Sequence, residues 1–215
     1  MPSSRIVCLS TLITIMLSLS PATRATIINF DLRNQAVSSA LDGSDTGLVM
    51  SQGLHAVFSS LVAEGSTSVF NLTSSSFGIN SLLTSLDKPS LIDATAFGSE
   101  AVQVVFSEFV YLREITLSSF TTLEWASLLV SGQPELLLNG KTSAIDSYSF
   151  NHLSIPAGTS LLLSHASGNG FSLDSIRVET ASLPEPTGLV LMLLVLGLLF
   201  LLRWFSYPAW PSGDG

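Results

Sequence analysis

Short runs in which apolar and polar residues alternate recur along most of this chain. In Ile27–Leu32 every second side chain is apolar, and Asn29 and Asp31 lie between them, which predicts a half-buried strand. Ala101–Phe106 and Val110–Leu117 are rich in β-branched and aromatic residues and predict two more strands. The same features predict further strands at Leu54–Val62, Ser68–Leu72, Trp125–Val130, Tyr148–Ile155, Ser160–Ser164 and Phe171–Glu179.

Residues that favour turns, mainly Gly, Ser, Asn, Asp and Pro, separate these runs. Asn139-Gly140 and Asn169-Gly170 are dipeptides typical of hairpin turns. No long amphipathic helix is expected, although Leu54–Val62 and Ser81–Leu86 fit either a helix or a strand. The regular spacing of strands and turns predicts an all-β fold, a jelly-roll-like β-sandwich.

The pattern changes near the C-terminus, where Leu189–Leu202 is a continuous apolar run. Each buried Leu, Val or Phe favours membrane insertion by roughly 0.3–0.6 kcal/mol. The run of fourteen residues contains nine Leu, and its flanking residues can extend it toward the roughly 20 residues that a bilayer requires. We therefore expect a single C-terminal transmembrane helix over about residues 187–205. The alternative, a buried helix of a soluble domain, would normally keep a polar stripe.

The N-terminus has the three parts of a secretory signal peptide. A basic residue precedes the mostly apolar Ile6–Leu19, and small residues follow. We expect residues 1–25 to be removed by cleavage after Ala25, with Ala22 as the alternative site and an uncleaved N-terminal anchor as the other interpretation. The single cysteine, Cys8, lies inside this segment, so the exported chain would have neither disulfides nor thiol chemistry.

The segment between these signals, residues 26–182, has the size of one domain. It carries fourteen acidic and five basic residues, and its basic residues form no run or stripe. Nucleic acid is therefore not an expected partner, because binding it requires a concentrated positive surface. An acidic segment rich in Ser and Thr suits an exported domain and could hold a divalent cation.

Motifs for catalysis are incomplete in this segment. The triplet Asp45-Thr46-Gly47 matches that of aspartic proteases, but it occurs once and follows Gly43-Ser44 rather than a hydrophobic strand. The histidines His55, His152 and His165 lack the spacing of metal ligands, and no G-x-S-x-G sequence is present. We therefore expect no catalytic residues and no enzymatic activity.

Two non-catalytic sites can be nominated. The apolar positions on either side of Asp174 are out of phase, which predicts a β-bulge. The bulge could aim this carboxylate at a structural Ca²⁺ together with Asp31; the alternative is that Asp174 pairs with a turn amide or with Arg177. Trp125 and Tyr148 are the candidate platforms for a glycan, since exposed aromatic rings offer one apolar face and one polar edge.

The C-terminal sequence resembles a known sorting signal. Leu183-Pro184-Glu185-Pro186, the Leu-rich helix and Arg203 look like the PEP-CTERM sorting domain of exported bacterial proteins, which would cover residues 183–215. The resemblance implies that an exosortase, a membrane transpeptidase, processes the chain near Pro184, Glu185 and Pro186. It also implies an association with exopolysaccharide or biofilm production.

The resemblance extends more loosely into the body of the chain. Residues 70–80 and 168–178 are similar to β-sandwich regions common in these proteins. The chain differs from the family in having Arg203 alone after the helix, where a basic cluster is usual, and in continuing to residue 215. Processing by an exosortase is therefore an expectation separate from membrane anchoring.

Three functions fit these observations. The first is an exported envelope or matrix protein with a non-enzymatic β-sandwich, in one version binding a glycan such as an exopolysaccharide. The second is a structural or adhesive envelope protein with no small ligand, and the third is a sandwich-borne hydrolase with two carboxylates facing one cleft. We prefer the first two. The expected location is the inner membrane facing the periplasm, or the cell surface after processing.

Overall fold

The computed structural model describes residues 25–62, 67–81, 87–95, 98–141, 145–180, 192 and 195–199. Ala25–Ala181 forms one compact unit, and antiparallel strands make up most of it. The signal peptide up to residue 24, Pro184, Glu185, Pro186, Arg203 and most of the expected span at 187–205 lie outside the described residues. No helix among the residues that are described is long and apolar enough to cross a membrane.

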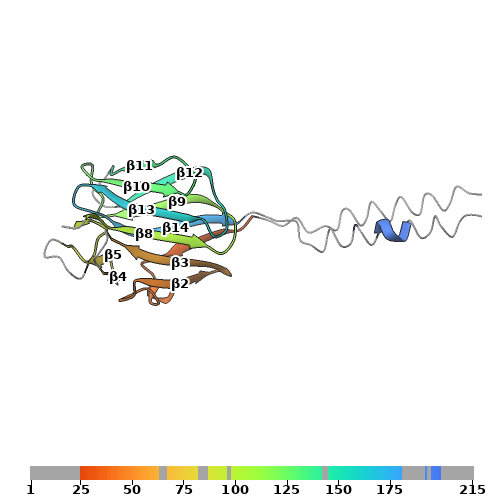
Figure 1. Cartoon of the computed structure of the whole chain (residues 1–215), viewed down its shortest axis with the longest axis horizontal. Coiled ribbons are helices and arrows are strands. Elements are labelled where there is room, and N and C mark those ends of the chain that lie inside the picture. Colours follow the sequence, from red (N-terminus) through yellow and green to blue (C-terminus); the bar gives the residue numbers. More distant parts are fainter. Residues whose placement is uncertain are drawn as a thin grey trace, which may run out of the picture. The chain divides into compact units, whose positions relative to one another are not determined.

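The larger sheet has six strands in the order β11-β10-β13-β8-β3-β2 (Figure 1). Every neighbouring pair in it is antiparallel. In chain order these strands are β2 (Thr46–Ser51), β3 (Leu54–Leu61), β8 (Ala101–Phe106), β10 (Trp125–Val130), β11 (Leu136–Asn139) and β13 (Ser160–Ser167).

The smaller sheet has four antiparallel strands in the order β1-β14-β9-β12. These are β1 (Ile27–Asp31), β9 (Val110–Ser118), β12 (Ile145–Ile155) and β14 (Ser172–Thr180). The first and last strands of the compact unit are therefore neighbours, with Ile27 opposite Glu179 and Asp31 opposite Ser175.

Shorter elements lie between the strands of the two large sheets in chain order: a helix between β1 and β2, and short strands between β3 and β8. The helix α2 (Gln35–Ser38) begins after Asn34, whose side chain accepts a hydrogen bond from the N–H of Ala36. Two small two-stranded sheets are formed by β4 (Ser68–Leu72) with β5 (Phe77–Ser81), and by β6 (Ala94–Thr95) with β7 (Gly98–Ser99).

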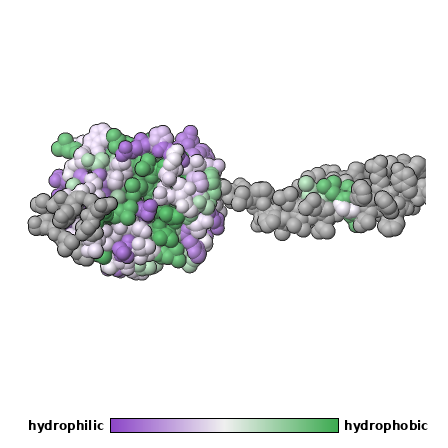
Figure 2. All heavy atoms as spheres, in the orientation of Figure 1, coloured by the Kyte–Doolittle hydropathy of each residue, from purple (hydrophilic) through white to green (hydrophobic). Residues whose placement is uncertain are grey.

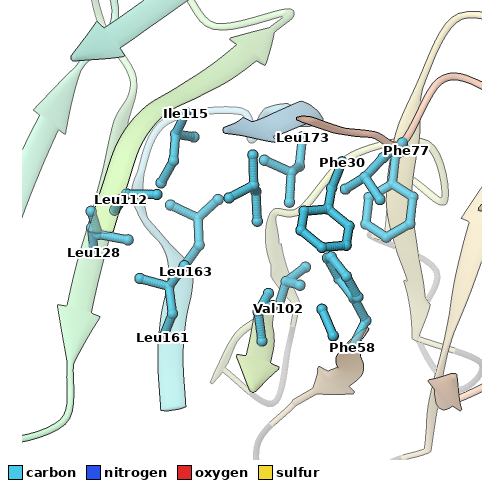
Figure 3. Packing of buried hydrophobic residues seen from close by; sticks show 14 of the residues in the cluster. Phe30, Phe58, Phe77, Val102, Leu112, Ile115, Leu128, Leu161, Leu163 and Leu173 are labelled. Carbon is cyan, nitrogen blue, oxygen red and sulfur yellow. The ribbon is translucent and has the colours of Figure 1, made fainter. Parts of the chain in front are cut away.

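The core lies between the two large sheets. Phe30 of β1 packs against Phe58 of β3 and Phe106 of β8, with ring centroids 6.3 and 5.8 Å apart. Leu112 and Ile115 of β9 face the same interior (Figure 3). Because one apolar cluster joins residues of both sheets, the fold is a β-sandwich, as the sequence predicts.

All nine strands predicted from the sequence are present, and Leu54–Val62, which fitted helix or strand, is β3 apart from its last residue. Five of the strands that the structure describes were not predicted: β2, β5, β6, β7 and β11. In β2, Val49 is the only buried residue, so the two faces of the strand are hardly distinguished in the sequence. The prediction of hairpins at Asn139-Gly140 and Asn169-Gly170 is wrong. The strands that flank each dipeptide belong to different sheets, so these turns carry the chain across the sandwich.

Candidate metal centre

The fold brings three acidic residues together at one end of the sandwich. Asp87, Asp93 and Glu100 each offer one carboxylate oxygen, and these three oxygens lie within 4.8 Å of one another. Glu100 is completely buried, Asp93 is 3% exposed and Asp87 is half-buried. We refer to these three residues as the acidic cluster.

Strand periodicity explains why Glu100 points inward. It immediately precedes β8, in which the buried side chains of Val102, Val104 and Phe106 occupy every second position. Glu100 continues this series by one step. It therefore projects a carboxyl group into the interior from the end of an otherwise apolar strand.

Asp87 and Asp93 are carried by the loop that follows β5. Ile92 fixes this loop by pairing with Phe171 in an isolated antiparallel bridge, with N–H···O distances of 2.7 and 3.1 Å. The loop also passes very close to Gly78, where a Cβ atom would lie 2.3 Å from the backbone nitrogen of Leu91. Any larger residue at position 78 would displace the loop and the acids it carries.

Hydrogen bonds from the surrounding chain orient the three carboxylates. Glu100 accepts one from the hydroxyl of Ser81 and one from the N–H of Asp93, the latter at 3.0 Å. The Oδ2 atom of Asp87 accepts the N–H of Ser81, and Oδ2 of Asp93 accepts the N–H of Lys88, both at 3.2 Å. The other oxygens of the two aspartates are buried and have no hydrogen-bond partner in the described structure.

Burial makes the charged form of these groups unfavourable. It raises the pKa of Glu100 to about 8; hydrogen bonds from Ser81 and Asp93 oppose the rise, and the charges of Asp87 and Asp93 add to it. Burial, together with the charge of Asp87, raises the pKa of Asp93 to about 6. Burial also raises the pKa of Asp87. Three mutually repelling carboxylates in this setting must share protons or be neutralised by a cation.

At the metal site predicted at Asp31 and Asp174, protein groups already bind the carboxylate of Asp174. The predicted bulge is present, since the register of β14 against β9 shifts between Leu173 and Ser175. However, Oδ2 of Asp174 pairs with Nη1 of Arg33 at 3.1 Å, and its Oδ1 accepts a hydrogen bond from Ser118 at 2.6 Å. Both oxygens of Asp174 thus have protein partners, and Arg33 supplies a positive charge where a cation was expected.

The structure does not bring the two predicted glycan platforms together. Trp125 begins β10 in the six-stranded sheet and is 39% exposed. Tyr148 belongs to the four-stranded sheet and is 8% exposed; its ring packs edge-on against Phe120, and its hydroxyl donates to the carbonyl oxygen of Asn139 at 2.5 Å. Of the two rings, only that of Trp125 offers a surface that a ligand can reach.

Trp125 belongs to a larger apolar surface. In β10 the side chains of Ala126 and Leu128 enter the core, so that Trp125 and Leu129 point to the opposite side of the sheet. Exposed apolar residues also gather on the face of the sandwich seen in Figure 2. We call the following residues, all at least 37% exposed, the outer face: Leu48, Met50, Val57, Leu61, Trp125, Leu129 and Leu137.

The acidic cluster was not predictable from the sequence, because its members lie in loops at spacings that match no metal-binding motif. One signal was available for Glu100, which continues the apolar series of β8 by one step. No comparable signal existed for Asp87 and Asp93, since the loop that carries them has no regular alternation. Their proximity depends on the pairing of Ile92 with Phe171, which are far apart in the sequence.

Comparisons with known proteins give little further information. No protein-family model matches the chain, and no curated protein matches it. Among solved structures, it is similar to an exo-beta-1,3-galactanase from Phanerochaete chrysosporium determined with galactose, with 14% sequence identity and a TM-score of 0.34. The match covers 57% of this chain and 32% of the galactanase, so the chain spans about a third of that protein. A similarity at this level identifies neither a shared fold nor a shared activity.

Proposed function

We propose that this chain is an exported, non-catalytic β-sandwich of the bacterial cell envelope, of jelly-roll type, that binds through its outer face. The observation that carries the proposal is the contrast between the two candidate surfaces. Two of the three acids of the cluster, Asp93 and Glu100, are enclosed by protein, whereas the outer face presents exposed apolar side chains and the ring of Trp125. A binding module needs an accessible surface of this kind, and a hydrolase needs accessible acids.

Burial argues against hydrolysis by the acidic cluster. Glycosidases place two carboxyl groups on either side of the bond that they cleave, whereas Glu100 is completely buried and Asp93 is 3% exposed. A surface hollow beside β2 is open to solvent, but Asp45 is the single acid among the residues that line it. Neither location supports an accessible pair of catalytic acids.

A glycan is the ligand that Trp125 supports best. Indole rings stack on the apolar faces of sugar rings, while neighbouring polar groups bind the hydroxyls. Asn139 and Ser167 lie opposite Trp125 on the two adjacent strands, and both are exposed. The second candidate, an adhesive or structural protein without a small ligand, is favoured by Leu48 and Met50, which are 53% and 62% exposed on the edge strand β2.

Location and processing are proposed from the sequence. The PEP-CTERM-like segment 183–215 contains Pro184, Glu185 and Pro186 followed by the apolar run and Arg203. We propose that a transmembrane helix over about residues 187–205 anchors the chain, facing the periplasm. An exosortase would then release it to the cell surface by processing near Glu185.

Binding is tested with the full-length chain, purified in detergent, on an array of bacterial exopolysaccharides. If the outer face binds a glycan, the unaltered chain should bind to the array and Trp125→Ala should abolish this binding. Tyr111→Ala, which removes a partly exposed aromatic ring from the four-stranded sheet, is the matched control and should retain it. Self-association without glycan binding, weakened by Leu48→Lys, would support the adhesive version instead. Release of shortened glycans would contradict a non-catalytic protein.

Export and processing are tested by fractionating cells that have or lack an exosortase and measuring intact mass. Processing predicts a mature form without the residues after Pro186, found only when the exosortase is present. If the measured mass includes Leu189–Leu202 in both strains, the protein is not processed and stays anchored in the membrane. Recovery of the whole chain in the cytoplasm would contradict export.

A further inference from the structure

We propose that Asp87, Asp93 and Glu100 bind one Ca²⁺, which ties the loop after β5 to the beginning of β8. This site is separate from the outer face and does not depend on the proposed function. It also differs from the site predicted at Asp31 and Asp174, because its ligands lie on other elements of the fold.

The spacing of the three oxygens fits a single ion. Ca²⁺–oxygen distances in proteins are about 2.3–2.6 Å, so two oxygens on opposite sides of one ion are about 5 Å apart. The oxygens of Asp87, Asp93 and Glu100 all lie within 4.8 Å of one another. One ion can therefore contact all three without any large movement of the chain.

Two buried oxygens in the cluster have no hydrogen-bond partner among the residues that the structure describes. Asp93 is only 3% exposed, and its Oδ1 atom accepts no hydrogen bond from the described residues. Oδ1 of Asp87 is also buried and has no hydrogen-bond partner among the described residues, although a side-chain hydrogen bond with Glu100 lowers the pKa of Asp87. Burying a carboxylate oxygen that loses its hydrating water and gains no hydrogen-bond donor destabilises the folded state, unless a cation contacts the oxygen. The neighbouring N–H groups already engage the other oxygen of each aspartate, so Oδ1 is the atom left for an ion.

No basic side chain of the described structure pairs with the cluster. Lys88 is adjacent in sequence to Asp87, but its Nζ donates to the carbonyl oxygen of Asn169 at 3.4 Å. The ion pairs found among the described residues join Arg33, Arg113 and Arg177 to acids outside the cluster. The charge of Lys88 acts on Asp93 and lowers its pKa, but it is one positive charge against three acids, and no basic side chain of the described residues forms an ion pair with them.

The ligand chemistry favours Ca²⁺ over other metals. All three ligands are carboxylates, with no His or Cys among them, which disfavours Zn²⁺ and Cu²⁺. Mg²⁺ requires nearly ideal octahedral geometry and usually retains several waters, whereas two of the three residues here are enclosed by protein. Ca²⁺ accepts an irregular set of oxygens and loses its water more readily.

The experiment measures thermal unfolding of the full-length chain in detergent, after EDTA treatment and removal of the chelator. Ca²⁺ at about 10 mM, well above the 10⁻⁴–10⁻³ M dissociation constants typical of extracellular modules, is expected to raise the unfolding midpoint by about 5–10 °C. Calorimetric titration with CaCl₂ should show a site that fills with one ion per chain. Mg²⁺ should produce a clearly smaller shift.

Two isosteric variants locate the ion. Asp93→Asn and Glu100→Gln each remove a charged ligand while keeping the size of the side chain, and each should abolish most of the Ca²⁺-dependent shift. Glu108→Gln removes an exposed acid away from the cluster and should retain the full shift. Circular dichroism shows whether each variant is folded before titration, and the pair of variants keeps the test decisive if one of them fails to fold.

Three results would overturn the proposal. Equal unfolding midpoints in Ca²⁺ and in EDTA would mean that the three carboxyl groups are held by shared protons. A Ca²⁺ shift retained by both Asp93→Asn and Glu100→Gln would place the ion elsewhere. A shift with Mg²⁺ equal to that with Ca²⁺ would contradict the assignment of the metal.

Discussion

Arg33 and Asp174 form an ion pair, 3.1 Å from Nη1 to Oδ2, between residues separated by 141 positions in the chain. Asp174 lies in the bulge of β14, and Arg33 follows the end of β1. Ser118 of β9 donates to the second oxygen of the same carboxylate. The pair therefore joins three neighbouring strands of the four-stranded sheet at the point where their regular pairing is interrupted.

Replacing Arg33 with Met should lower the free energy of unfolding by about 1–3 kcal/mol, because it leaves the buried carboxylate of Asp174 without its cation. Urea unfolding measures the loss. Arg177→Met is the matched control, since Arg177 reaches Glu114 at 4.0 Å on the surface and should contribute less than about 1 kcal/mol. Equal losses in the two variants would mean that burial of Asp174 does not strengthen its pair.

Phe30 should be among the most costly positions of the core to truncate. Its side chain is completely buried and packs against Phe58 (Figure 3) and also against Phe106. Phe30→Ala is expected to cost about 3–5 kcal/mol, because the cavity lies where the two sheets meet. The half-buried Phe109 provides the comparison, and Phe109→Ala should cost roughly 1 kcal/mol. Chemical denaturation of both variants tests the difference.

Gly170→Ala should damage both the fold and the acidic cluster. Gly170 has a φ of +97°, and a Cβ atom there would lie 2.5 Å from Cβ of Asp93 and 2.8 Å from the carbonyl oxygen of Ile92. We expect a loss of more than about 2 kcal/mol and a weaker response to Ca²⁺. Gly132→Ala has a similar φ of +84° with no atom within 4 Å, so it should cost only the backbone strain, about 1–2 kcal/mol. If both variants lose the same stability, the close approach to Asp93 is unimportant.

Tyr148 should make the fold sensitive to high pH. Burial raises the pKa of Tyr148 to about 12, and the charge of Asp146 adds to the rise. The folded state then holds this proton more tightly than the unfolded chain, whose tyrosine has a pKa of about 10. The resulting stability is fully present below pH 10 and is lost as the pH rises through 12.

We therefore expect Tyr148→Phe to lose less stability than the unaltered chain between about pH 10 and 12. Urea unfolding midpoints measured across this range provide the comparison. Nζ of Lys141 lies 4.4 Å from the centre of the Tyr148 ring, so both pH profiles are also measured with Lys141→Met to remove the contribution of this lysine. Tyr111→Phe serves as the control and should behave like the unaltered chain. Parallel pH profiles for all three proteins would show that Tyr148 makes no such contribution.

The fold was largely predictable because strands leave a local record in the sequence. The buried series in β8 and the change of phase around Asp174 are both visible within ten residues, and both proved informative. β2 left almost no record, since most of its side chains face solvent on either side. The dipeptides Asn139-Gly140 and Asn169-Gly170 led to a wrong prediction of hairpins, because such dipeptides favour a turn but do not determine which sheet the next strand joins.

The sites were less predictable because their members meet only through tertiary structure. The sequence suggested a Ca²⁺ shared with Asp31 as the partner of Asp174, or else a turn amide or Arg177, whereas the pairing of β1 with β14 brings Arg33 to it. Tyr148 has the composition of a ligand platform, but its inward position follows from the alternation of β12, in which Ser147 and Ser149 are exposed. Local sequence cannot distinguish these outcomes.

The pairing of β1 with β14 also has a mechanical consequence. Thr26 and Thr180 are hydrogen-bonded at the same end of this antiparallel pair, with the N–H of Thr180 3.0 Å from the carbonyl oxygen of Thr26. A force that pulled these two residues apart would break the hydrogen bonds between β1 and β14 one after another, starting at this end. A force on the end of β14 alone would meet a strand held on both sides, by β1 and by β9. A sandwich tethered only through Thr180 would therefore resist pulling better than one stretched between its two ends.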